Sequence, residues 1–112
     1  MIPKDKFSVI YSFKIVEGKE IEFIKSWSEL TKLIYEYEGS YGSSLHKVDN
    51  NFFLAYALWP DRDTWKNSGS KFPDIATKYK NRLRECCSAI KTEYELKVVN
   101  DLLQSDTFIT MK

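Results

Sequence analysis

The sequence has 112 residues, which is enough for one hydrophobic core but not for two. Seventeen basic and sixteen acidic residues leave a net charge of +1, which argues against a nucleic-acid-binding or membrane-binding surface. No stretch approaches the length of a transmembrane helix, and residues 1–7 lack the apolar core of a signal peptide, so we expect a cytoplasmic protein. Aromatic residues make up 15% of the chain, which indicates either a ring-lined cavity or interface, or simply an aromatic core.

The first two predicted elements are a strand and a long helix. Residues 7–15 alternate between apolar and more polar side chains, which is typical of a strand with one strongly apolar face. From Lys19 the apolar residues are spaced three or four apart, which predicts a helix that ends near Gly39. The residues predicted to face the core from this helix are Phe23, Trp27, Leu30, Ile34 and Tyr37.

A hairpin and a short helix are predicted next. Residues 41–48 are rich in glycine and serine and predict a weak strand, which residues 49–51 connect by a turn to the following strand. That strand covers residues 52–59 and is apolar on both faces, as expected for a strand buried on both sides. Pro60 ends it, and residues 61–67 can form a short helix.

The last predicted elements are a helix and a fourth strand. Asp74 is expected to cap the helix, and the strand is expected over residues 93–102. Beyond it, residues 103–112 are a polar tail in which residues 107–111 can add a strand. The apolar residues of the predicted helix are Ile75, Tyr79, Leu83, Cys86 and Ile90. Both cysteines therefore fall in this helix, where we expect them to be reduced, with one packed inward.

The order β-α-β-β-α-β predicts an α+β, ferredoxin-like fold with an antiparallel sheet, formed by residues 1–112 as a single domain with its core at about residues 7–102. The first and third strands are then central, in agreement with their apolar character. Two helices cover only one face of such a sheet, whereas the third strand is apolar on both faces. We therefore expect a homodimer in which a second copy packs against the free sheet face. Cover by the C-terminal tail is the alternative.

Three segments together resemble the antibiotic-biosynthesis-monooxygenase-type domain family over residues 7–100. They are Val-Glu-Gly-Lys-Glu at residues 16–20, where the first strand ends, the pattern Glu-x-x-Phe-x-x-x-Trp at residues 20–27, and the run from Glu38 to Trp65. The most specific part of that run is Tyr-Ala-Leu-Trp-Pro at residues 56–60, followed by Asp-Arg-Asp-Thr-Trp. The resemblance implies a dimeric α+β barrel with a pocket between sheet and helices. It also implies a monooxygenase that needs no cofactor and lets a small aromatic or apolar substrate react with oxygen. A non-catalytic small-molecule-binding or stress-related barrel is the alternative function.

The haem-degrading branch of this family is a poorer match. Trp59 falls where that branch places a tryptophan against the haem. However, residues 74–90 contain no histidine for the iron, and residues 7–15 lack the asparagine that the branch carries there. One histidine and two adjacent cysteines also give no zinc-site spacing. We therefore expect neither a haem nor a protein-bound metal.

The residues predicted to be catalytic are His46, Trp59 and Tyr11. His46 is the only imidazole of the chain, and imidazole is well suited to act as a general base near neutral pH. No acidic residue lies at a spacing that would orient it, so a surface or interface role is the alternative. Trp59 and Tyr11 lie on the two central strands, with Tyr11 on the strongly apolar face.

Trp27, Tyr56 and Tyr79 are predicted to bind substrate, because their rings supply stacking surfaces. Tyr56 and Trp59 lie on opposite faces of a regular strand, so they cannot both line one pocket. Arg82 and Arg84 could supply a cation for a phenolate, and they equally suit a solvated helix surface. The same rings would also suit a purely structural core, so the aromatic pattern leaves both interpretations open.

Overall fold

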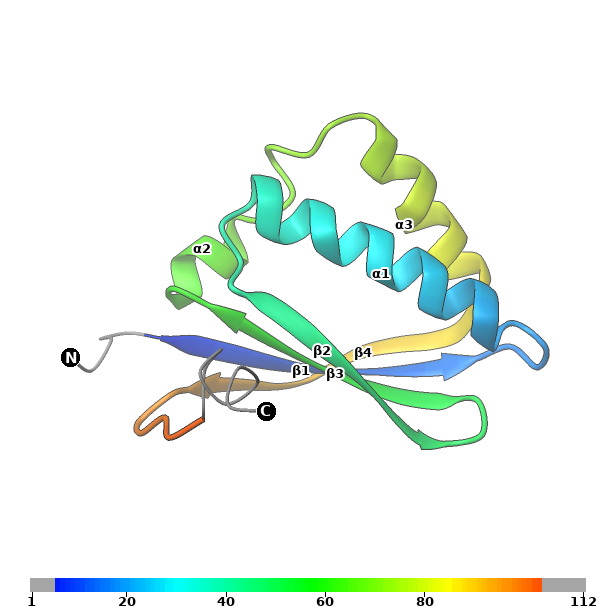
Figure 1. Cartoon of the computed structure of the whole chain (residues 1–112), viewed down its shortest axis with the longest axis horizontal. Coiled ribbons are helices and arrows are strands. Elements are labelled where there is room, and N and C mark those ends of the chain that lie inside the picture. The colour runs from blue at the N-terminus through cyan, green and yellow to red at the C-terminus, as the bar shows by residue number, and fades with distance from the viewer. Residues whose placement is uncertain (1–5, 104–112) are drawn as a thin grey trace, which may run out of the picture.

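The computed structural model describes residues 6–103 as a four-stranded antiparallel sheet with all three helices on one side of it (Figure 1). In chain order the elements are β1 (Phe7–Ile15), α1 (Glu20–Tyr37), β2 (Gly42–Asp49), β3 (Phe52–Trp59), α2 (Arg62–Lys66), α3 (Ile75–Glu85) and β4 (Cys87–Lys97). The strand order is β2-β3-β1-β4. The predicted ferredoxin-like fold is thus confirmed, with β1 and β3 as the central strands.

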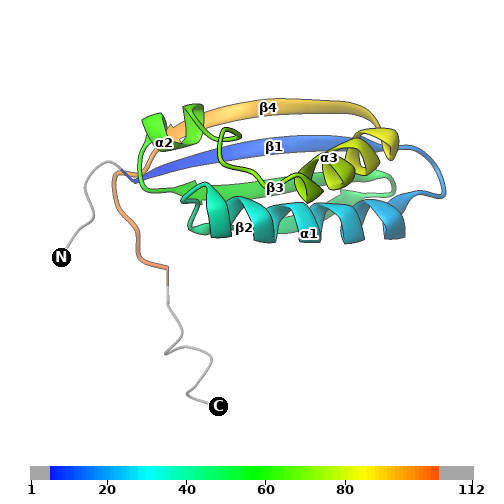
Figure 2. The same ribbon diagram turned by 90° about the horizontal axis from the view of Figure 1, so that it is seen from above.

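The two central strands pair along their whole length. Their register runs from Phe7 opposite Trp59 to Lys14 opposite Phe52. Because side chains alternate between the faces, Phe7, Tyr11 and their alternate neighbours share one face with Ala55 and Trp59. The helices cover this face, as the view from above also shows (Figure 2).

The long helix α1 packs on the sheet through Phe23. This side chain has no exposed surface, and its ring lies between Phe13 and Phe53, with centroid distances of 5.0 and 5.4 Å. The helix ends where predicted, because Gly39 adopts a φ of +85° that few other residues tolerate. The prediction for Tyr37 is wrong, since 45% of its surface is exposed. The last turn of α1 lies farther from the sheet than its first turn (Figure 1).

The boundary between α3 and β4 also differs from the prediction. The helix ends at Glu85 instead of continuing to Ile90, and β4 begins at once with Cys87, which pairs with Ile15. The apolar spacing stays helical through this region and no glycine or proline marks the end. Pairing with β1 therefore decides the boundary. Asp74 stands at the start of α3 but makes no capping hydrogen bond.

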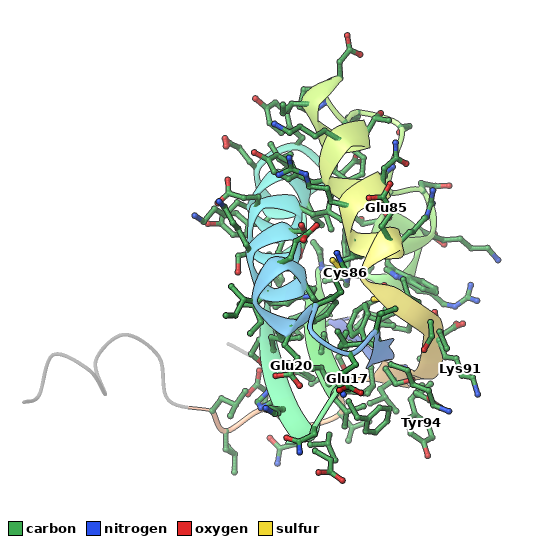
Figure 3. All side chains as sticks on the ribbon, turned by 90° about the vertical axis from the view of Figure 1, so that its right-hand side faces the viewer. Glu17, Glu20, Glu85, Cys86, Lys91 and Tyr94 are labelled. Atoms are coloured by element: carbon green, nitrogen blue, oxygen red, sulfur yellow. The ribbon has the colours of Figure 1, made fainter. Side chains whose placement is uncertain are left out.

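Both cysteines are free thiols, as predicted, although neither lies within the helix. Cys86 is fully buried where α3 meets β4, beside α1 (Figure 3). Burial raises the pKa of Cys87 to about 11. This thiol therefore stays protonated and unreactive near neutral pH.

The sheet face that the helices leave uncovered is rich in apolar residues. Ile10, Leu54, Tyr56 and Leu58 are half-buried on it. Tyr94, 63% exposed, shares this face and points away from the helices (Figure 3). Residues 107–111, predicted to add a strand, lie outside the described residues. Within residues 6–103, no helix is both long and apolar enough to span a membrane.

Candidate functional site

A cavity of about 190 Å³ lies between the helix-covered face of the sheet and helices α1 and α3. The rings of Tyr11, Trp27 and Trp59 line it, and Thr31 and Ser43 supply hydroxyl groups. Apolar side chains make up most of the remaining wall. The cavity therefore has the composition of a small-molecule site, with a few polar groups in an apolar enclosure.

The alternation of large and small residues along β3 creates this space. Phe53 and Trp59 are large, whereas Ala55 and Ala57 between them are small and share the same face. Tyr11 in β1 pairs with Ala55, so its ring stands beside the gap that the alanines leave. The helix α1 closes the gap from above with Trp27.

Trp59 lines the cavity, but its indole Nε1 is buried in the protein and has no hydrogen-bond partner in the described part of the chain. The side chain is only 3% exposed, and among residues 6–103 nothing accepts a hydrogen bond from its Nε1. A buried donor without an acceptor costs about 1–3 kcal/mol. Native proteins usually avoid this cost, so such a group suggests a missing partner.

Tyr11 is held in place by Trp65 of α2. The Trp65 Nε1 donates a hydrogen bond to the Tyr11 hydroxyl oxygen at 2.7 Å, and the Trp65 ring packs on Phe7 with a centroid distance of 5.6 Å. Burial raises the pKa of the Tyr11 hydroxyl, an effect that the hydrogen bond from Trp65 opposes and the negative charge of Glu95 reinforces. Tyr11 is therefore a neutral phenol near neutral pH.

Trp65 was not predicted to belong to the site. It ends the Asp-Arg-Asp-Thr-Trp segment, but its spacing in the sequence gives no sign of a contact with Tyr11. The contact depends on how α2 folds back over the end of β1. Asp61 starts that helix by accepting a hydrogen bond from the backbone N–H of Thr64 at 2.7 Å.

The structure separates the other predicted site residues from the cavity. His46 is exposed on the uncovered sheet face, where it pairs with Leu54 and its Nε2 lies 2.9 Å from the Ser44 hydroxyl. Tyr56 lies on the same face. Tyr79 packs against the main core from α3 but does not line the cavity. Of the six predicted residues, the cavity thus brings together Tyr11, Trp27 and Trp59.

No charged side chain lines the cavity within the described part of the chain. Arg82 and Arg84, considered as partners for a phenolate, are both exposed on α3. The electrostatics of the site therefore come from neutral donors and acceptors. Such a site can orient a ligand through hydrogen bonds, but it offers no charge to neutralise an ionised group.

Comparison with protein-family models and with curated proteins gives no match. Among solved structures, the chain is similar to a mutant form of SnoaB, a cofactor-independent oxygenase from Streptomyces nogalater. The TM-score is 0.71 at 15% identity, over 89% of this chain and 99% of that one. This chain has the same fold. The resemblance inferred from the sequence is thereby confirmed at the level of the fold.

Two further structures show how widely the fold is used. A candidate antibiotic biosynthesis monooxygenase from Chloroflexus aurantiacus matches with a TM-score of 0.72 and 14% identity, over 87% of this chain and 96% of its own. A protein of unknown function from Nitrosomonas europaea matches with a TM-score of 0.71 and 12% identity, over 93% and 99% of the two chains. Because one fold hosts many functions, activity has to be argued from the cavity.

Proposed function

We propose that the chain is a cofactor-independent monooxygenase that acts on a small aromatic or apolar metabolite bound in the cavity. The observation that carries this proposal is the apolar cavity lined by the rings of Tyr11, Trp27 and Trp59. The similarity to SnoaB, which is named as a cofactor-independent oxygenase, supports the same reaction type. An apolar enclosure suits the chemistry because it keeps water away from a reactive intermediate.

Each cavity residue has a role in the proposed reaction. Trp27 stacks on the substrate ring. The Nε1 of Trp59 is buried, so the indole must turn toward the cavity when substrate binds; it then donates a hydrogen bond to a substrate oxygen that gains negative charge as the reaction proceeds. The Tyr11 hydroxyl is the second proposed donor. The substrate supplies the electrons: one atom of O₂ enters a C–H position, and the other leaves as water with two hydrogens from the substrate. His46, Tyr56 and Tyr79 have no role in this proposal, because they do not line the cavity.

The test is turnover of 1,5-dihydroxynaphthalene under ¹⁸O₂. This electron-rich diphenol and one O₂ should yield 5-hydroxy-1,4-naphthoquinone and one water, with a single labelled oxygen in the quinone. We expect Trp59→Phe to lower kcat/KM by about 100-fold, the usual effect of removing a donor to a developing oxyanion. Mass spectrometry of the quinone, corrected for the protein-free reaction, measures the result.

Tyr94→Phe is the control for this experiment. It also removes an aromatic polar tip, but from the face that lies away from the cavity, so its turnover should equal that of the wild type. Equal turnover by Trp59→Phe and wild type would contradict the assignment of Trp59. Absence of labelled quinone above the protein-free rate would contradict the proposed reaction with this diphenol.

A non-catalytic binding protein is the second candidate function. It is favoured by one observation: among the described residues, the cavity is lined by no acid–base pair. Such a protein would retain a ligand and release it unchanged. Native mass spectrometry of the protein purified from its own host should detect a bound ligand. If the protein is a carrier, incubation with that ligand and oxygen should leave the ligand unchanged.

We propose in addition that two copies associate through the uncovered sheet face. Ile10, Leu54, Tyr56 and Leu58 form an apolar centre there, and charged residues such as Lys91 and Lys14 lie nearer its margin. An apolar centre with a polar rim is the usual anatomy of a protein interface. The same patch on both copies gives an isologous contact.

Light scattering at micromolar concentration should therefore give twice the 13.2-kDa chain mass. Leu54→Lys should yield the monomer mass, because it places a charge in the apolar centre of the contact. The matched control is Ile21→Lys, whose side chain is 86% exposed on α1, and it should remain dimeric. A monomer mass for the wild-type protein would rule out the proposed contact.

A further inference from the structure

The short helix α2 and the loop after it form a strap, residues 61–71, between β3 and α3. The strap ends at Phe72, which packs against the main core. Figure 2 shows α2 over one end of the sheet, away from α3. None of the five residues of α2 is buried, and two surface hollows of about 400 and 320 Å³ are lined partly by the strap. The strap is therefore loosely packed, and such segments open locally while the rest of a protein stays folded.

Hydrogen bonds to three different elements hold the strap in place. They are the bonds from Arg62 Nε and Nη2 to Glu95 Oε1 of β4 (3.2 and 3.1 Å), from Trp65 Nε1 to the Tyr11 hydroxyl oxygen of β1 (2.7 Å), and from the Lys71 backbone N–H to Glu38 Oε2 at the end of α1 (2.8 Å). The side chains of Arg62 and Glu95 are 49% and 41% exposed, so water competes for their contact and the ion pair is weak. A single hydrogen bond also contributes only modestly to stability. Each of the three anchors can therefore break at small cost.

The ring of Trp65 lies on residues that form the wall of the cavity. It packs against the smaller buried cluster, which includes Ala57 and Trp59, and it donates a hydrogen bond to Tyr11. Ala57, Trp59 and Tyr11 all line the cavity as well. The closed strap thus covers one part of the cavity wall, and its opening would take Trp65 away from that wall.

The closed cavity is small for the proposed substrate. Cavities that hold drug-sized ligands typically measure about 300–1,000 Å³, whereas this one measures about 190 Å³. The Nε1 of Trp59 is also sealed inside the protein. An opening beside Tyr11 and Trp59 would both admit a ring and free the Trp59 indole to turn.

We propose that the strap is a lid, which opens by breaking its three anchors, admits substrate to the cavity, and closes with Trp65 back on Tyr11. Closure then keeps water away from the reacting substrate. The admission of substrate rests on the proposed function, whereas the opening of the strap does not.

Opening is measured without a ligand by hydrogen exchange of the Trp59 indole N–H in ¹H–¹⁵N NMR spectra, with Trp59→Phe to assign the signal. This group is buried and has no acceptor among residues 6–103, so its exchange rate reports how often water reaches it. In the wild type we expect it to share one opening equilibrium with the backbone N–H of Asn67, which bonds to the Asp63 carbonyl at 2.9 Å within the strap. Dilute urea should change both rates little, unlike those of the amides that pair β1 with β3, since local opening exposes little surface.

Variants that break an anchor should raise both exchange rates. We expect about 2- to 5-fold for Arg62→Ala, which loses one exposed ion pair, and about 2- to 10-fold for Trp65→Phe, which keeps a ring but loses the bond to Tyr11. The matched control is Lys66→Ala, which removes a cation from the same helix and should change neither rate. Trp59 exchange that stays unchanged in both anchor variants, or that occurs only with global unfolding, would overturn the lid.

Entry of substrate is measured by stopped-flow binding of 1,5-dihydroxynaphthalene without oxygen. Arg62 is not among the described residues that line the cavity, so Arg62→Ala should raise the association and dissociation rate constants by the same factor as the exchange rates and leave Kd unchanged. Unchanged rate constants, or a change in dissociation alone, would overturn the lid as the entrance. If the diphenol does not bind, the proposed function fails with this probe, and Trp59 exchange still decides whether the lid opens.

Discussion

Replacing Phe23 by alanine should lower the free energy of unfolding by about 3–5 kcal/mol, the largest effect we expect from any single core substitution. Phe23 is the fully buried ring through which α1 contacts both central strands, between Phe13 and Phe53. Its removal leaves a void that flat aromatic neighbours cannot fill. Small domains are stable by only about 5–15 kcal/mol, so much of the stability would be lost. Urea denaturation at one fixed protein concentration measures the change.

Ile21→Ala provides the control in the same helix. Ile21 is 86% exposed, so the substitution should change the free energy of unfolding by no more than about 0.5 kcal/mol. A loss of less than about 1 kcal/mol for Phe23→Ala would contradict the packing of α1 on the sheet, because it would mean that the ring is not enclosed.

Ala55→Leu should abolish ligand binding while the protein stays folded. Ala55 is 1% exposed on β3 and faces the cavity opposite Tyr11, so the larger side chain would occupy space that a ligand needs. Overpacking in a core costs about 1–3 kcal/mol, but here an existing cavity receives the added carbons, so we expect a cost at or below this range. The affinity for 1,5-dihydroxynaphthalene should fall by more than about 100-fold, measured by calorimetric titration without oxygen.

The matched control is Ala89→Leu. Ala89 of β4 pairs with Lys14 of β1 and lies on the uncovered face, so the same enlargement there should leave binding of 1,5-dihydroxynaphthalene unchanged. Normal binding by Ala55→Leu would place the ligand elsewhere on the protein. Loss of binding by both variants would instead mean that ligand binding depends on the intact sheet or on the dimer.

The two faces of the sheet have different expected roles. The helix-covered side has small residues at Ala55 and Ala57, which leave room for a ligand. The other side of the same strand has Leu54, Tyr56 and Leu58, which fill space and present a broad apolar area. Strand β3 is therefore apolar on both faces for two separate reasons, one of which is the proposed ligand and the other the proposed partner.

Local periodicity was sufficient to predict most of the fold. The alternation in residues 7–15 and 52–59 and the helical spacing after Lys19 predicted β1, β3 and α1, because each pattern records which side chains must be buried. The placement of Tyr56 and Trp59 on opposite faces of β3 followed from the same two-residue period. These features depend on neighbours along the chain, so the sequence by itself determined them.

Tertiary structure decided what no local pattern contains. The start of β4 at Cys87 depends on pairing with Ile15, and Trp65 joins the site only because α2 folds over the end of β1. The face on which His46 lies depends on the register between β2 and β3, since a shift of one residue would turn it to the other side. Residues far apart in sequence make these contacts. The sequence therefore determined β1, α1 and β3, whereas long-range pairing decided where β4 begins and which side chains meet in the cavity.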